Sequence, residues 1–373
     1  MNKYLLYLPL IITLFISSCT KDDNNNCTRI VVEVTTDIST PTVWEDCHVY
    51  VISVNQISVT STLTIQPGAI VKFKDIVSDN SILVSNSGQI IANGTSENPI
   101  IFTSYKDDEN GGDSNGDGSA SSPAQKDWGG IIINSNNCEF RHCNFMYGGE
   151  GPDAGTGQPT LEFSSYYGII DYCTFAYCGG ETTFNGYGVV DARSCQNTSF
   201  SITNSVFYGC IKPLFVNPFI SIGNTNTFHN PDNASQKNSL NGIFLTNEAN
   251  AATSDVTWLE DEVPFVLTGS LYITTVGTKL VLGSGVIIKV KDSPAPGNKI
   301  TFKEGITSIE GNGSAGVYFT SYLDDAHGGD TNGDGTASSP ASSDWYGIQD
   351  YTATIGTNNF CYSWGNILYA QYP

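Results

Sequence analysis

The chain has 373 residues, and 37 Asp and Glu against 16 Lys and Arg give a formal net charge of −21. This balance argues against nucleic acid as a partner, because neutralising phosphates takes basic clusters, whereas an acidic surface suits cation binding and solubility outside the cell. Only 14% of the residues are charged and 38 are Gly, which predicts short strands and turns rather than long helices.

The first residues carry the features of an export signal. Residues 1–18 combine a short charged start with an apolar run too short to span a membrane. Small residues precede Cys19, and this ending resembles the lipobox of bacterial lipoproteins, which implies that Cys19 becomes the lipidated first residue. Residues 19–28 are a polar tether, and its Lys-Asp-Asp resembles the signal that sends Bacteroidota-type lipoproteins to the outer face of the outer membrane. The alternative is an ordinary secretory peptide with an incidental cysteine.

The chain has ten cysteines, so an odd number remains once Cys19 is set aside. Exported cysteines commonly form disulfides, and Cys27 and Cys47, which flank the first predicted strand, are candidates for one. Cys143 and Cys173 fall instead in a repeated phrase, and we expect them to be reduced core thiols rather than disulfides or metal ligands. The sequence leaves the disulfide pairing open.

A long segment of the sequence occurs twice. GGDSNGDGSASSPAQKDW at 111–128 returns as GGDTNGDGTASSPASSDW at 328–345, an offset of 217 residues. Between 102–128 and 319–345, 20 of 27 positions are identical. The sequence therefore predicts a module at about 42–131 that is repeated at about 256–348.

A shorter phrase recurs in the middle of the chain. It is built on Phe145, Phe175, Phe207 and, more faintly, Phe228, at spacings of 30, 32 and 21 residues. A β-sandwich has no reason to repeat one phrase at unequal spacing, but a solenoid does, because each coil adds a strand to the same sheet while loops leave at corners. We therefore expect an interior ladder of these four rings. The same alignment gives an interior column of Cys143, Cys173 and Ser205 and a corner column of His142, Tyr172 and Asn204.

Two further phrases, at 98–104 with 127–131 and at 264–289, resemble the right-handed parallel β-helix of the pectate-lyase-like kind, found in extracellular repeat proteins of Bacteroidota-type bacteria. The resemblance covers most of residues 42–350. It implies an all-β, single-stranded right-handed parallel β-helix with long corner loops over 29–373. It implies little about activity, because this fold carries enzymes, adhesins and inert stalks.

The repeated loop places oxygen-bearing side chains at i, i+2 and i+4 before a glycine. Asp113, Asn115 and Asp117 resemble the first half of the EF-hand calcium loop, but its twelfth position is Ala124 instead of Glu. A further carboxylate must come from Asp107 or Asp108 before the loop, or from Asp127 after it. We predict structural Ca²⁺ in these loops. The predicted ligands are Asp113, Asn115, Asp117 and Asp127 in the first copy and Asp330, Asn332, Asp334 and Asp344 in the second.

The alternative for these loops is a solvated Asx-turn without metal, because Asp, Asn, Gly and Ser favour turns on their own. In the second copy, Asp324 and Asp325 match the carboxylates that precede the loop. Trp128 and Trp345 end the two loop phrases, and we expect them to cover the edge of a coil.

Catalytic candidates are weak. Arg141 and Asp171 are expected to be neighbours on an outer face, and Glu150 and Glu181 are expected to approach each other in long loops. Paired carboxylates hydrolyse glycosides, and aromatic residues nearby could stack on sugar. We favour the alternative that the two glutamates are ordinary loop residues and that Arg141 and Asp171 form an ordinary ion pair.

Three functions remain open. The favoured one is a non-enzymatic outer-membrane lipoprotein, exposed at the cell surface, whose calcium-stabilised loops serve adhesion or glycan binding. Its partners are the membrane, through the lipid anchor, and an extracellular glycan or a host or neighbouring surface. The alternatives are a polysaccharide lyase or glycoside hydrolase acting on an extracellular glycan, and a structural spacer.

Overall fold

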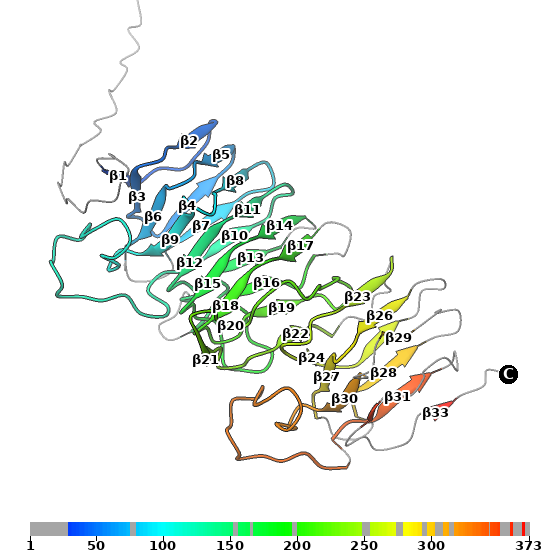
Figure 1. Cartoon of the computed structure of the whole chain (residues 1–373). Coiled ribbons are helices and arrows are strands. Elements are labelled where there is room, and N and C mark those ends of the chain that lie inside the picture. The colour runs from blue at the N-terminus through cyan, green and yellow to red at the C-terminus, as the bar shows by residue number, and fades with distance from the viewer. Residues whose placement is uncertain are drawn as a thin grey trace, which may run out of the picture.

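The computed structural model describes residues 29–74, 80–151, 156–164, 167–195, 200–247, 254–273, 279–292, 297–302, 309–312, 317–342, 344–350, 359–360 and 368–369. In these residues the secondary structure is entirely β, wound as stacked coils into an elongated rod (Figure 1). None of them forms a helix that could cross a membrane. The predicted signal peptide, Cys19 and the tether lie outside the described residues.

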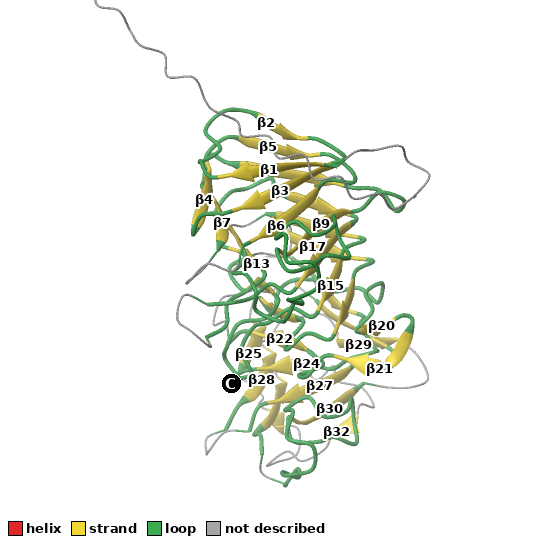
Figure 2. Ribbon diagram, turned by 90° about the vertical axis from the view of Figure 1, so that its left-hand side faces the viewer, coloured by secondary structure: helices red, strands yellow, loops and turns green. Residues whose placement is uncertain are grey.

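Three parallel sheets run along the rod, and successive coils lie over one another (Figure 2). Sheet A contains β1 (Ile30–Val34), β3 (His48–Ile52), β6 (Ile70–Phe73), β9 (Ile100–Ser104), β12 (Cys143–Met146), β15 (Thr174–Ala176) and β18 (Val206–Tyr208). Sheet B contains β4 (Gln56–Val59), β7 (Ser81–Val84), β10 (Ile131–Ile133), β13 (Leu161–Phe163), β16 (Val190–Ala192), β19 (Leu214–Val216), β22 (Ile243–Leu245), β24 (Phe265–Leu267), β27 (Ile287–Val290), β30 (Tyr318–Ser321) and β32 (Asn359–Phe360). Sheet C contains β2 (Thr42–Trp44), β5 (Thr62–Ile65), β8 (Gln89–Asn93), β11 (Glu139–Arg141), β14 (Gly168–Asp171) and β17 (Phe200–Thr203).

Smaller elements complete the second half. One sheet contains β23 (Val256–Trp258), β26 (Leu280–Gly283) and β29 (Ile309–Asn312), and another contains β25 (Leu271–Ile273), β28 (Lys299–Phe302), β31 (Gly347–Asp350) and β33 (Leu368–Tyr369). An antiparallel hairpin joins β20 (His229–Asn230) to β21 (Asn233–Lys237). All other pairings between the described strands are parallel, which confirms the predicted parallel β-helix.

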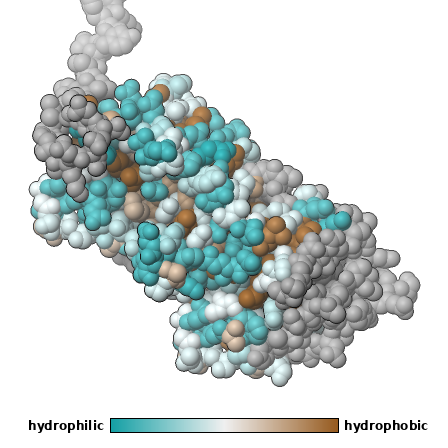
Figure 3. Space-filling model, in the orientation of Figure 1, coloured by the Kyte–Doolittle hydropathy of each residue, from teal (hydrophilic) through white to brown (hydrophobic). Residues whose placement is uncertain are grey.

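The interior of the rod contains the predicted aromatic ladder. Phe145, Phe175 and Phe207 stack with ring centroids 4.8 and 4.9 Å apart, and Phe228 follows at 5.5 Å. Phe102 extends the ladder at the other end, 4.7 Å from Phe145. The outer surface has the opposite character, because the face seen in Figure 3 is mostly hydrophilic with small hydrophobic patches. Each of these coils contributes one ring to the ladder, beside the other buried side chains of the core.

The cysteines follow the expected division. Cys143 and Cys173 are buried and free, as predicted, and Cys173 N–H donates to Ser205 Oγ at 3.2 Å in the same column. Cys138, Cys178 and Cys210 are also buried and free, and Cys195 is buried as well. Cys47 is disulfide-bonded, and its candidate partner Cys27 lies outside the described residues.

In three coils, the turn from sheet C to sheet A begins with a residue in the left-handed conformation. These residues are His142, Tyr172 and Asn204, with φ of 47°, 53° and 51°, which confirms that they share a corner. A left-handed conformation costs a non-glycine residue about 1–2 kcal/mol, so this corner is tight at some expense in local strain. The long loops leave instead between sheets A and B, after β9, β12 and β15.

The two modules have corresponding strands in different sheets. β6 and β9 of the first copy belong to sheet A, whereas their counterparts β27 and β30 belong to sheet B. Sheet A ends after β18, beside which the β20–β21 hairpin packs. The second copy is therefore shifted by one sheet around the coil, from sheet A to the neighbouring sheet B. The constant sequence offset does not reveal this shift.

The expectation for the two tryptophans was wrong. Trp128 and Trp345 are fully buried in the core instead of covering a coil edge. The Trp128 ring stacks on Phe73 at 4.0 Å, and its Nε1–H donates to Met146 O at 2.8 Å. Trp128 therefore lies inside the rod, in contact with both β6 and β12.

Candidate functional site

The first acidic loop leaves the rod after β9 (Figure 1), and its first residues pack against the outer face of sheet A. Val49, Val51 and Ile70 are buried there, with Tyr105 of the loop packed against them. A Cβ added to Gly111 would lie 3.0 Å from Val49 Cγ2, and Gly111 has φ of +86°. Glycine is therefore needed for both the backbone conformation and the close approach, and this part of the loop is fixed on the sheet.

A buried lysine anchors the loop from beneath. Lys72 is fully buried, and its Nζ donates to Asp107 O and Gly112 O, both at 2.7 Å. In the second copy, Lys289 Nζ donates to Gly329 O at 2.5 Å and to Thr331 Oγ1. Burial lowers the pKa of each lysine to about 8. Both copies of the apolar strand phrase contain this lysine, a signal that our sequence reasoning missed.

Each loop gathers three carboxylates. The first triad is Asp108, Asp113 and Asp117, each offering an oxygen within 4.8 Å of the others. The second triad has the same spacing and consists of Asp325, Asp330 and Asp334. Two predicted ligands of each loop therefore lie together. The third carboxylate of each triad comes from the residue before the loop, Asp108 or Asp325.

Asp127 is placed elsewhere. Its Oδ2 accepts hydrogen bonds from Ser104 Oγ at 2.7 Å and Ala124 N–H at 2.9 Å, and its Oδ1 pairs with Lys106 Nζ at 3.0 Å. These contacts tie the two ends of the loop together. Asp344 repeats them with Ser321 and Ala341. Neither residue belongs to a triad.

The first triad is ordered by Asx-type hydrogen bonds. Asp113 accepts from the backbone N–H of Gly116 at 2.7 Å and Gly118 at 2.9 Å. Asn115 Nδ2 donates to Asp117 Oδ2 at 3.0 Å, and its Oδ1 accepts from Asp117 N–H at 3.3 Å. Asp330 and Asn332 make the equivalent contacts in the second loop. The hydrogen bonds expected of an Asx-turn, the alternative that needs no metal, are therefore present.

That network leaves part of each triad unsatisfied. Asp108 Oδ1 and Asp325 Oδ1 are buried and have no hydrogen-bond partner. Burial, followed by repulsion from Asp113, raises the pKa of Asp108, and burial with repulsion from Asp330 does the same for Asp325. A hard divalent cation would remove both penalties, because carboxylate oxygens are its preferred ligands. The residues present therefore fit Ca²⁺.

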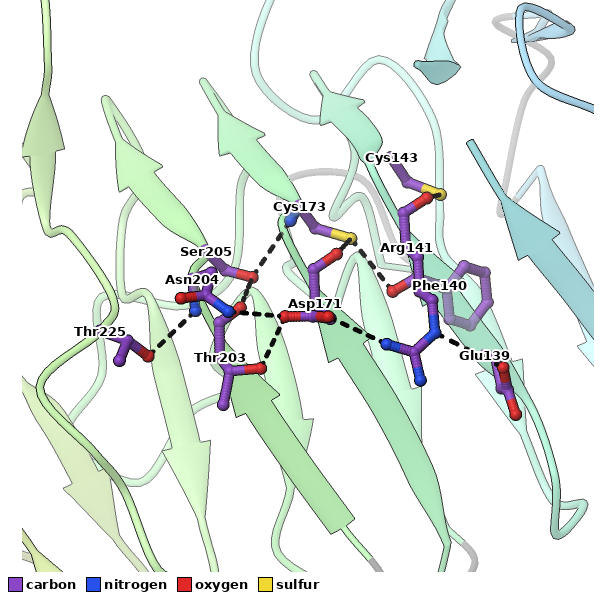
Figure 4. Close-up of polar contacts among 10 residues, drawn as sticks. All are labelled: Glu139, Phe140, Arg141, Cys143, Asp171, Cys173, Thr203, Asn204, Ser205 and Thr225. Atoms are coloured by element: carbon purple, nitrogen blue, oxygen red, sulfur yellow. Dashed lines mark hydrogen bonds and ion pairs between the residues drawn. The ribbon is translucent and has the colours of Figure 1, made fainter. Parts of the chain in front are cut away.

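The weak catalytic candidates on sheet C form a saturated ion pair (Figure 4). Arg141 and Asp171 are register neighbours, as expected, and Arg141 Nη1 lies 2.9 Å from Asp171 Oδ2. Asp171 Oδ1 accepts from Thr203 Oγ1 at 2.8 Å and Asn204 Nδ2 at 2.9 Å. Glu139 adds a longer contact of 3.6 Å to Arg141 Nε. Asp171 thus has partners on both oxygens, which suits a structural role.

The loops that contain Glu150 and Glu181 meet at Gly157. Glu150 pairs with Gly157 in an isolated antiparallel bridge. A Cβ on Gly157 would lie 3.1 Å from Glu181 Cγ. Glu181 Oε2 accepts from Thr183 Oγ1 at 2.9 Å. The structure therefore brings both segments to one place, although residues 152–155 between them lie outside the described part of the chain.

One comparison with known proteins gives a match. Residues 36–186 match the family described as the pectate-lyase like beta helix domain. The match includes the first acidic loop and ends well before the second. No curated protein and no solved structure matches the chain. The comparison agrees with the three stacked parallel sheets, and the chain is similar to this family over those residues.

Proposed function

We propose that the protein is a cell-surface lipoprotein whose β-helix displays calcium-stabilised loops for adhesion or glycan binding, without catalysis. The observation that carries the calcium part is the carboxylate triad, formed in both copies with the same spacing. Its buried, unpartnered oxygens, Asp108 Oδ1 and Asp325 Oδ1, provide independent support, because native proteins rarely leave such atoms unsatisfied.

Calcium suits these loops better than magnesium. Ca²⁺ accepts roughly 6–8 oxygen ligands in flexible geometry, whereas Mg²⁺ demands a near-ideal octahedron. Three carboxylates from one loop, completed by backbone carbonyls or water, match the first requirement. The two loops are long and belong to different sheets, so bound cations would stiffen two separate parts of the surface.

A binding role is supported by the chemistry of the candidate acids. Catalytic carboxylates need a free oxygen and a tuned pKa. Asp171 has three hydrogen-bond or ion-pair partners instead, and Arg141 is occupied by Asp171 and Glu139. Glu150 and Glu181 remain the basis of the alternative, a glycoside hydrolase or polysaccharide lyase, because their loops meet at Gly157.

The location is proposed from the sequence. The lipobox-like ending before Cys19 and the polar tether at 19–28 support an anchor in the outer membrane, with the rod facing outward. Incorporation of labelled palmitate into the protein in a bacterial host, and its loss in Cys19→Ser, would test the anchor. Protease accessibility on intact cells would test the outward orientation.

Calorimetric titration of the metal-free protein with CaCl₂ tests the calcium sites. We expect two binding events per chain, a melting temperature that falls in EDTA, and one event in Asp113→Asn or Asp330→Asn. Glu109→Gln is the control, because Glu109 is exposed beside the first triad but outside it. Absence of calcium uptake, together with the same melting temperature in EDTA, would refute the calcium proposal.

Glycan arrays test the proposed glycan binding, and activity screens on polyuronides and neutral glycans test the proposed absence of catalysis. Binding without turnover supports the proposal. Turnover that is lost in Glu150→Gln or Glu181→Gln supports the enzyme alternative. If the protein neither binds nor cleaves any of these glycans, the structural spacer is the remaining function.

A further inference from the structure

A third buried lysine holds a different loop. Residues 181–187, here called the strap, contain the three backbone carbonyls that surround the ammonium group of Lys212. Lys212 is fully buried, and its Nζ donates to Thr183 O at 3.0 Å, Phe184 O at 3.0 Å and Gly186 O at 2.7 Å. A protonated ammonium has three donors and no acceptor, so its hydrogen-bonding capacity is matched by this cradle.

The strap connects the outer face of sheet B to the second acidic loop. Phe184 packs edge-on against Phe244 at 6.0 Å and Tyr322 at 4.8 Å between ring centroids. Tyr322 donates its hydroxyl to Thr331 O at 3.2 Å, next to the second triad. Lys212 Nζ lies 4.7 Å from the Phe244 ring centroid. Fixing or releasing the strap would therefore act on this aromatic cluster.

The charged groups around Lys212 do little to keep it protonated. Asp191 and Glu181 favour the ammonium, but Asp191 pairs with Arg193 at 2.8 Å. Arg193 opposes protonation through its own positive charge. Burial is the largest effect, and together these factors lower the pKa of Lys212 to about 7.

We propose that the strap is a proton-gated cover, held closed by the Lys212 ammonium and loosened when that group gives a proton to the solvent. A neutral amine retains two N–H donors and gains a lone pair, which must face one of the three carbonyls. That carbonyl then faces a lone pair and loses its lysine donor, which weakens the cradle. Thr183 O still accepts from the N–H of Gly186 at 3.0 Å, whereas the contact that Gly186 O would lose is buried, a loss that native structures avoid. The closed strap therefore belongs to acidic conditions and the open strap to alkaline ones, with the change near neutrality.

Hydrogen exchange of the full-length protein, read by mass spectrometry from pH 6 to pH 9, tests the proposal. After correction for intrinsic exchange rates, protection of peptides covering 181–187 should fall by about tenfold as pH rises. The midpoint should lie near neutrality, whereas an ordinary lysine titrates at about 10.4. Peptides from β5, in sheet C and outside the aromatic cluster, are the reference and should not change. Equal strap protection at pH 6 and pH 9, which an ordinary lysine would also give, would overturn the proposal.

Lys212→Met provides the second arm. Its strap should be poorly protected at both pH values, because no ammonium holds the carbonyls. A Met variant that retains the wild-type pH dependence would overturn the assignment to Lys212. Glu260→Gln is the matched control, because Glu260 is another buried group with a pKa of about 7 but lies outside the strap. If the Met variant fails to fold, the pH dependence of strap protection in the wild type tests the proposal on its own.

Discussion

Phe145 and Phe175 lie ring over ring, with centroids 4.8 Å apart and planes 6° from parallel, although 30 residues of chain separate them. β12 and β15 pair in register on either side of the excursion, so its length does not disturb the stack. This relationship repeats from coil to coil, and the same interior position recurs wherever the phrase recurs. The stability of the rod therefore depends on contacts between adjacent coils.

The central ring of the ladder is the most sensitive position. Phe175 is fully buried between Phe145 and Phe207, so Phe175→Ala opens a cavity and should lower the free energy of unfolding by about 3–5 kcal/mol. Urea denaturation followed by circular dichroism measures the loss. Phe175→Leu fills most of the space and should lose less. A loss below about 1 kcal/mol in the Ala variant would contradict the ladder as a stabilising element.

The buried lysines should control their own loops separately. Lys72→Met removes the ammonium that donates to Asp107 O and Gly112 O, so residues 105–128 should become susceptible to limited proteolysis in EDTA. Lys289→Met should expose 322–345 instead. Each variant is the control for the other, and mass spectrometry of the fragments identifies the loop that is cut. Uniform resistance of both loops in both variants would show that the lysines do not hold them.

The ion pair on sheet C should contribute modestly. Asp171→Asn turns one carboxylate oxygen that faces Arg141 into a donor and should cost about 1 kcal/mol of unfolding free energy, because the pair is partly exposed. Glu139→Gln should cost less, since its contact with Arg141 is longer, at 3.6 Å. Thermal unfolding at low and high salt measures both. Equal effects of the two variants would argue against Asp171 as the centre of this network.

Glu260 gives a pH-dependent prediction. It is 1% exposed, and burial raises its pKa from 4.5 to about 7. Below pH 4.5 the folded and unfolded states are both protonated, so the group has no effect; between 4.5 and 7 only the unfolded state ionises, and stability falls. Above pH 7 the folded state also ionises, and the loss levels off at roughly 3 kcal/mol.

Glu260→Gln should therefore stabilise the protein at pH 8 and leave it unchanged at pH 4. Gln retains the acceptor for the N–H of Glu262, which Glu260 Oε1 now binds at 3.0 Å. Asp261→Asn, at an exposed neighbouring position, is the control and should have little effect at either pH. The melting temperatures of the wild type and the two variants at pH 4 and pH 8 test this prediction. A stability gain that is the same at pH 4 and pH 8 would point to packing rather than to ionisation.

Much of the fold followed from repetition in the sequence. The recurring Phe positions predicted the interior ladder, and the adjacent Cys143 and Cys173 were correctly expected as reduced core thiols. Register pairing also confirmed Arg141 and Asp171 as neighbours. These inferences succeed because a solenoid places equivalent positions of successive coils in contact. Trp128 was misplaced because its phrase gives no sign of where the chain turns inward.

The sequence by itself determined that the chain forms coils, that its loop is written twice and that each loop concentrates carboxylates, because these are properties of local pattern and spacing. Only the tertiary structure decided that Asp108 joins Asp113 while Asp127 closes the base of the loop, and that Lys72 anchors it from below. It also placed the second module one face further around the rod. Such choices depend on how a loop folds back over a neighbouring sheet, which residue spacing along the chain does not encode.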